Sequence, residues 1–257
     1  MIGDIKHIVV IESLKDESLT GKELYNDCIR RRVDLYNKPI THKYHFVENK
    51  AQFIELLKYF EVNGRFFRDG LLIHLEMHGS KEGGLALIDD SLINWEELVL
   101  LLRPINIATC NKLYLTMATC YGRFLYLGID PYLKAPYSGY ISASMEVSGG
   151  EILENFFALF EYLIEVGNLI AAYQETEEGI EKFYYKDLET SFEDAFQMEV
   201  TRLNEDKGYK EEFVQGCIEE AKAKGGDIPD EIQIEEMFEM ALGRIYNRQK
   251  AAFNFSC

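Results

Sequence analysis

The sequence has no apolar run of the roughly 18 residues that a membrane-spanning helix needs, so the chain is not expected to cross a membrane. The segment Met1–Asp4 carries an acid ahead of a short apolar run and is unlike a secretory signal. The five cysteines are scattered, without a CxxC pair or a recognisable disulfide pattern. Together these absences favour a reduced, cytoplasmic protein.

Basic residues are also scarce, because 27 Lys and Arg stand against 44 Asp and Glu, for a net charge of −17. Nucleic-acid backbones and anionic membranes would repel such a chain, so neither is expected as a partner. Most of the excess lies in residues 174–240, which hold 21 acidic and 7 basic residues. This stretch is interpreted either as a solvated helical face or as a docking surface for a basic partner. Glycine-rich phosphate-binding loops are absent as well.

The 257 residues, 47% of them hydrophobic, suit one sizeable domain with or without a helical appendage. The first 150 residues alternate strand-like and helix-like patterns. The strand-like runs are Ile5–Ile11, Tyr44–Val47, Leu71–Met77, Leu85–Ile88, Leu113–Ala118 and Tyr140–Met145, and the helix-like runs are Thr20–Arg31, Lys50–Phe60 and Asn94–Arg103. Thr20 is predicted to cap the first of these helices, and Pro104 to stop the third.

Strands that alternate with helices predict an α/β fold, with a mostly parallel sheet covered by helices on both faces. From Ile152 onward every segment has helical spacing. We therefore expect an α/β domain over residues 1–166, followed by an acidic helical extension over residues 167–257. The apolar stripes of the extension indicate that it packs on the domain or on a partner.

Two of the predicted strands end in residues that suit catalysis. Leu71–Met77 is followed by His78 and Gly79, and Leu113–Ala118 is followed, after one residue, by Cys120. Ligands of an open parallel sheet bind outside the carboxyl ends of its strands, so this histidine and this cysteine are expected at one edge.

The pair has a recognised chemistry. A thiol is a weak nucleophile until a base takes its proton, and an imidazole does this and later protonates a leaving amine. The backbone N–H groups of Gly79 and Cys120 are predicted to form an oxyanion hole. A short helix starting at Gly122 would place a helix N-terminus near the thiolate.

The segments IHLEMHGS, LALIDDSLINWEEL, LYLTMATCYG and ISASMEVSGGEILENFFALFEYL resemble the caspase-like cysteine peptidases, and most of all their bacterial branch of CHAT or caspase-like effector domains. The resemblance covers roughly residues 1–165 and includes the His-Gly and Cys-x-Gly motifs, 42 residues apart. It implies a caspase-like fold, with Cys120 as the nucleophile and His78 as the general base and acid. It further implies oxyanion donors from Gly79 and Cys120.

The chain departs from that family at Ala118, where caspases carry glutamine and several Arg/Lys-specific relatives carry aspartate. The preference for the residue before the scissile bond (P1) therefore stays open at this stage. Glu146, just past a predicted strand, is a candidate for the substrate pocket, or else a solvated loop residue. His74 shares a strand face with His78, but no further ligand completes a metal site, so His74 is interpreted as a satisfied polar residue.

The predicted function is that of a cysteine endopeptidase that cleaves a protein substrate with a His78–Cys120 dyad and needs no metal or organic cofactor. The resemblance implies a bacterial stress or antiphage-defence effector that a protein partner activates. Two alternatives stay open: an inactive scaffold or binding protein of the same fold, and another thiol hydrolase such as an amidase.

Overall fold

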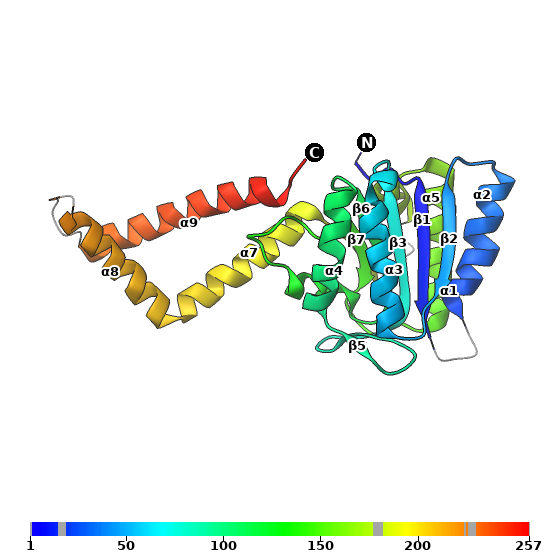
Figure 1. The fold of residues 1–257 in the computed structure, drawn as a ribbon, viewed down its shortest axis with the longest axis horizontal. Helices are drawn as coiled ribbons and strands as arrows, with labels where there is room; N and C mark the ends of the chain where they lie inside the picture. The colour runs from blue at the N-terminus through cyan, green and yellow to red at the C-terminus, as the bar shows by residue number, and fades with distance from the viewer. Residues whose placement is uncertain (1, 15–18, 177–181, 224, 226–229, 257) are drawn as a thin grey trace.

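The computed structural model describes residues 2–14, 19–176, 182–223, 225 and 230–256. Its centre is a twisted sheet in the order β2-β1-β3-β6-β7-β8 (Figure 1). The strands on this path are β1 (His7–Ser13), β2 (Thr41–Phe46), β3 (Leu71–Ser80), β6 (Leu113–Ala118), β7 (Gly139–Ala143) and β8 (Phe183–Asp187). Neighbouring strands are parallel except β8, which runs antiparallel to β7. The short strands β4 (Gly84–Ala86) and β5 (Leu92–Ile93) extend antiparallel from the end of β3.

Helices cover both faces of the sheet, because successive strand residues point to opposite sides and both sides are apolar. One face packs against α1 (Thr20–Glu23), the π-helical η1 (Leu24–Arg30), α2 (Arg31–Leu35), α5 (Gly149–Val166) and α6 (Leu169–Thr176). The other packs against α3 (Lys50–Asn63), α4 (Trp95–Ala108) and the 3-10 helix η3 (Gly122–Gly128), with η2 (Gly64–Phe67) following α3. Val10 in β1 lies in the first core and Val9 in the second.

The last three helices form an arm that projects from the sheet domain (Figure 1). They are α7 (Leu188–Glu205), α8 (Lys207–Ala223) and α9 (Glu231–Phe253). The base of the arm is anchored, since Phe192 and Phe253 are both fully buried with ring centroids 5.3 Å apart. Its far part exposes Ile232 and Met240. No helix in the described residues is long and apolar enough to span a bilayer.

The predicted α/β fold, with its mostly parallel sheet and helical C-terminal part, is confirmed, and the predicted strand Leu113–Ala118 matches β6 residue for residue. The prediction that everything after Ile152 is helical is wrong at β8, which adds a strand to the sheet edge. The projecting part of the extension accordingly starts at α7. The sequence also indicates a helix break at Gly225-Gly226-Asp227, ahead of α9, and this segment lies largely outside the described residues.

Pro104 lies inside α4 and does not stop it. Proline removes the hydrogen bond to the carbonyl of Leu100 and crowds that carbonyl, but Leu100 is 54% exposed, so the disturbed turn lies on the solvent side of the helix. The next turn is held by burial of Ile105 and by Asn106, whose side chain donates to the carbonyl of Ala135 at 2.9 Å. Tertiary packing therefore outweighs the local penalty.

Candidate active site

His78 and Cys120 lie side by side at the carboxyl edge of the sheet. In the parallel register of β3 and β6, Glu76 pairs with Ala118, and His78 and Cys120 each follow their paired residue by two positions. His78 points to the same side of β3 as Glu76, and Cys120, in the turn after β6, contacts Val147 just before α5, so both residues lie on the sheet face that α5 covers. The predicted meeting of the two motifs at one edge is thereby found in the structure.

Both residues line one cavity of about 160 Å³. Its remaining lining comes from β3, β6, the segment after β1, and the starts of α1 and α5. These residues are Leu14, Thr20, Glu76, Met77, Ala118, Val147, Gly149 and Ile152. The space holds several water molecules, since one water needs roughly 10–15 Å³. The cavity therefore accommodates one long side chain beside the thiol.

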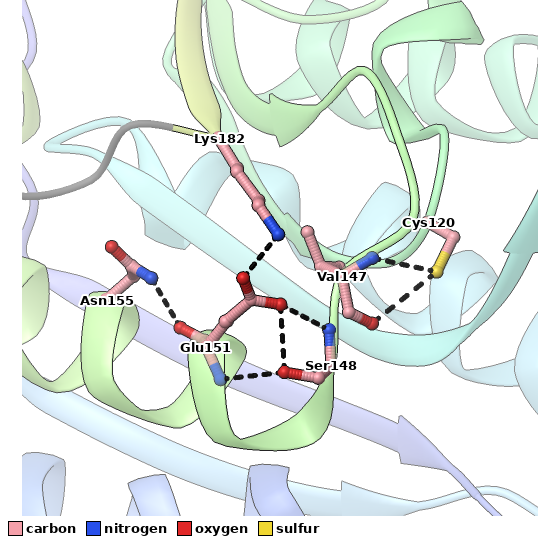
Figure 2. A network of polar contacts seen from close by, with 6 residues as sticks. All are labelled: Cys120, Val147, Ser148, Glu151, Asn155 and Lys182. Atoms are coloured by element: carbon pink, nitrogen blue, oxygen red, sulfur yellow. Dashed lines mark hydrogen bonds and ion pairs between the residues drawn. The ribbon is translucent and has the colours of Figure 1, made fainter.

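The Cys120 thiol is partly exposed and contacts the segment that leads into α5 (Figure 2). The backbone N–H of Val147 points at Sγ with N···S of 3.5 Å, and Sγ lies 3.7 Å from the carbonyl oxygen of the same residue. The thiol can donate to that carbonyl, and a thiolate would accept from that N–H. No hydrogen bond joins Cys120 to His78 in the described part of the chain, and the exposed His78 ring has no hydrogen-bond partner there.

The segment beside the thiol is held in place by the first turn of α5 (Figure 2). Ser148 and Glu151 form a reciprocal capping box, in which each side chain accepts from the other's backbone N–H. Lys182 forms an ion pair with Glu151 and, with the capping bonds, lowers the pKa of that carboxyl to about 2. Gly149, at the helix start, lines the cavity, so the positive end of the α5 dipole lies at the same site.

Glycine is required where the ends of the two central strands meet. A Cβ on Gly79 would lie 2.3 Å from the carbonyl oxygen of Cys120, so the two backbones are in direct contact. A Cβ on Gly122 would lie 2.8 Å from Thr119 Oγ1. Tyr121, which lies between Cys120 and Gly122, has a φ of 60°, a left-handed conformation that turns the chain into η3. No hydrogen bond among the described residues uses the N–H of Cys120, which leaves it free for a ligand.

A buried polar network lies next to His78 and Cys120 on the same sheet face. Its members on β3 are two and four residues before His78. His74 is fully buried, and its ring nitrogens lie 2.8 Å from Thr116 Oγ1 and 2.8 Å from Glu76 Oε2. Thr20 donates its hydroxyl to the other oxygen of Glu76. The prediction of His74 as a satisfied polar residue is confirmed. Thr20 does not cap the helix it begins, because its hydroxyl is used by this network.

Glu12 of β1 belongs to the same network, since it pairs in register with Glu76. It is fully buried and accepts from the backbone N–H of Gly21 at 2.9 Å, that of Lys22 at 3.1 Å and the hydroxyl of Tyr44 at 2.7 Å. Burial raises the pKa of Glu12, the nearby Glu76 raises it further, and these hydrogen bonds oppose the shift. Two carboxylates thus lie side by side beneath the cavity.

The sequence did not identify Glu12, Glu76 or Thr20 as site residues. The sequence did contain a hint of the role of Glu76. It lies two residues from both His74 and His78 in an otherwise apolar strand, so all three side chains point to the same side. Glu146 is exposed and does not line the cavity, so its pocket role stays a prediction. Among the described residues no group of three His, Cys, Asp or Glu side chains is arranged to hold a metal ion.

The other cysteines differ from Cys120. Cys28 is buried, donates to the carbonyl of Phe157 at 3.7 Å, and has its pKa raised by burial to about 12. Cys110 is disulfide-bonded, so the expectation of unpaired cysteines is wrong at this position. Cys120 is therefore the partly exposed free thiol within residues 2–14, 19–176 and 182–205.

Comparison with known proteins found no relative in two searches: no protein-family model matches the chain, and no curated protein matches it either.

Proposed function

We propose that the chain is a cysteine endopeptidase in which Cys120 is the nucleophile and His78 the general base and acid. The observation that supports this most is that both side chains line one cavity, from adjacent central strands and on the same sheet face. The inactive-scaffold alternative would be favoured by opposite faces, which is not the arrangement found. The looser contact between the two groups suits a site without substrate, because catalytic hydrogen bonds tighten on binding.

In the proposed reaction, Cys120 Sγ attacks the carbonyl carbon of the scissile peptide bond, and His78 accepts the thiol proton. The N–H groups of Gly79 and Cys120 stabilise the tetrahedral oxyanion. The C–N bond then breaks as His78 returns the proton to the leaving amine, which leaves a thioester. Water, deprotonated by His78, hydrolyses the thioester, releases the carboxylic acid and regenerates the thiol.

The backbone N–H of Val147 points at Sγ with N···S of 3.5 Å, so this contact holds the sulfur at the cavity for the first step. The start of α5 lies at the same cavity. The resemblance to caspase-like effectors extends the proposal to a protease that a protein partner activates in bacterial defence. The projecting acidic arm offers a surface for such a partner.

The test is cleavage of a peptide library by the full chain, with the variants Cys120→Ala and His78→Ala. We expect cleavage by the wild type and a loss of at least a hundredfold in kcat/KM in each variant. Cys28→Ser is the matched control, since it changes a buried thiol outside the cavity. Unchanged cleavage in either dyad variant overturns the proposal. Cleavage of small amides without peptides would support the amidase alternative instead.

A further inference from the structure

The cavity beside Cys120 has a carboxylate in its floor. Glu76 lines the cavity although its side chain is only 1% exposed, so it has almost no contact with bulk water. It lies two residues before His78 on the same strand face, directly beneath the dyad. A side chain that enters this space next to the thiol would end against Glu76.

Glu76 has no lysine or arginine partner among the described residues. Its hydrogen bonds are to the hydroxyl of Thr20 and the ring of His74, while Glu12 beside it is bound by two backbone N–H groups and the hydroxyl of Tyr44. No Lys or Arg side chain of the described residues contacts either carboxylate. Among the described residues, the imidazole of His74 is therefore the basic side chain that contacts this pair of carboxylates, and it contacts Glu76 alone.

The walls of the cavity are apolar above this floor. Leu14, Met77, Val147 and Ile152 contribute to its lining. Lysine and arginine suit such a shape, because their aliphatic stems pack on apolar walls while the terminal cation reaches a polar group. A carboxylate has about four lone-pair sites, so Glu76 can accept further hydrogen bonds beyond the two it already makes.

We propose that this cavity is the pocket for the P1 side chain and that Glu76 selects arginine or lysine there. The inference rests on the proposed peptidase function and adds the substrate class. It takes the selecting acid from β3, because the position two residues before the nucleophile is Ala118 and carries no charge. The exposed Glu146 has no part in it.

Other P1 residues fit the cavity less well. An acidic side chain would be repelled by Glu76 and Glu12. An apolar side chain would offer the buried Glu76 carboxylate no hydrogen bond, which is unfavourable. A cation is the one common side-chain type that compensates the buried charge.

The first experiment compares kcat/KM of the full chain for matched peptides that differ only at P1, with Arg, Lys, Leu, Gln and Asp. We expect at least a hundredfold preference for Arg or Lys over Leu and Gln. Glu76→Gln keeps the size of the side chain and removes its charge, so the preference should fall at least tenfold. Glu82→Gln, an exposed acid on the nearby β3–β4 turn, is the matched control and should keep the full preference.

The second experiment needs no turnover and no variant. Alkylation of Cys120 by iodoacetamide is followed by mass spectrometry with butylguanidine present, and butylurea serves as the neutral control of similar shape. We expect butylguanidine to slow alkylation of Cys120, and butylurea not to. Equal effects of the two compounds overturn the pocket assignment.

The two experiments separate the two proposals. Cleavage that prefers Leu at P1, without protection by butylguanidine, leaves the peptidase standing and overturns the role of Glu76. Protection by butylguanidine, with no peptide cleaved whatever its P1 residue, supports a cation pocket and overturns the peptidase function.

Discussion

Glu12 on β1 lies directly beside Glu76 on β3, and both carboxylates are buried on the sheet face that carries the dyad. Two carboxylates buried side by side are rare in a protein core, because the negative charge of each disfavours ionisation of the other. Here hydrogen bonds satisfy both groups: Glu76 accepts from Thr20 and lines the cavity, and Glu12 accepts from backbone N–H groups of α1.

We expect Glu76→Gln to lower the pKa of Glu12 toward its ordinary value of 4.5, because it removes a neighbouring negative charge. Burial, the larger cause, stays in place, so part of the upward shift should persist. Carbon-13 NMR titration of the Glu12 carboxyl measures this directly, with Glu82→Gln as the control. An unchanged Glu12 pKa in the Glu76 variant would contradict the coupling.

The same shift has a consequence for stability. Since the pKa of Glu12 is higher in the folded chain than in the unfolded one, folded molecules bind more protons between the two values. The contribution of Glu12 to the free energy of unfolding is therefore greatest below about pH 4.5 and declines as the pH rises through the folded pKa. Urea unfolding at a series of pH values should show a smaller decline in Glu76→Gln than in the wild type.

Gly79→Ala should disrupt the site, because the added Cβ would lie 2.3 Å from the Cys120 carbonyl oxygen and must push the two strand ends apart. Overpacking of this kind costs about 1–3 kcal/mol of unfolding free energy. We also expect at least a tenfold loss of kcat/KM, as the N–H groups of both residues are displaced. Gly243→Ala is the control, since nothing lies within 4 Å of its added Cβ and the residue is inside α9. It should leave activity unchanged and stabilise the arm slightly.

The free thiols should differ in reactivity at neutral pH. Burial raises the pKa of Cys28 to about 12, so almost no thiolate is present there, whereas Cys120 is partly exposed beside an N–H donor. We predict that iodoacetamide modifies Cys120 at least tenfold faster than Cys28, as measured by peptide mass spectrometry. In Cys120→Ala, modification of Cys28 should require unfolding. Rapid labelling of Cys28 in the native chain would refute this.

The base of the arm should contribute far more stability than its far part. Phe253 is fully buried against Phe192, so Phe253→Ala is expected to cost about 3–5 kcal/mol. Met240 is 56% exposed, and Met240→Ala should change the free energy of unfolding by less than about 0.5 kcal/mol. Denaturant unfolding compares the two, and equal losses would show that the arm is not anchored at its base.

The parts of the structure that follow from local patterns were predictable. The apolar run that became β6 and the paired motifs at two strand ends needed only periodicity and the rule for parallel sheets. The acids beneath the cavity were not, because Glu12 and Glu76 are 64 residues apart and meet only through strand register. The sequence favours a helix cap at Thr20 for a related reason: the partner of its hydroxyl, Glu76, is distant in the chain.

Local sequence also failed to predict the continuation of α4 past Pro104 and the strand β8. Local preferences disfavour both features, and burial of their side chains stabilises them. β8 contributes Phe183 to the core with α5, a contact that no periodicity within residues 183–187 reveals.

The position of β3 between β1 and β6 sets how the site behaves in motion. From Leu71 to Glu76 it is flanked by β1 and β6, to which its backbone N–H groups bond, so their hydrogen exchange should require opening of the whole sheet domain and report its global stability. Glu76 and His78 belong to this strand, and their spacing is therefore fixed before any ligand arrives. Binding would spend little conformational entropy on ordering them, in contrast to sites built on loops that must first close.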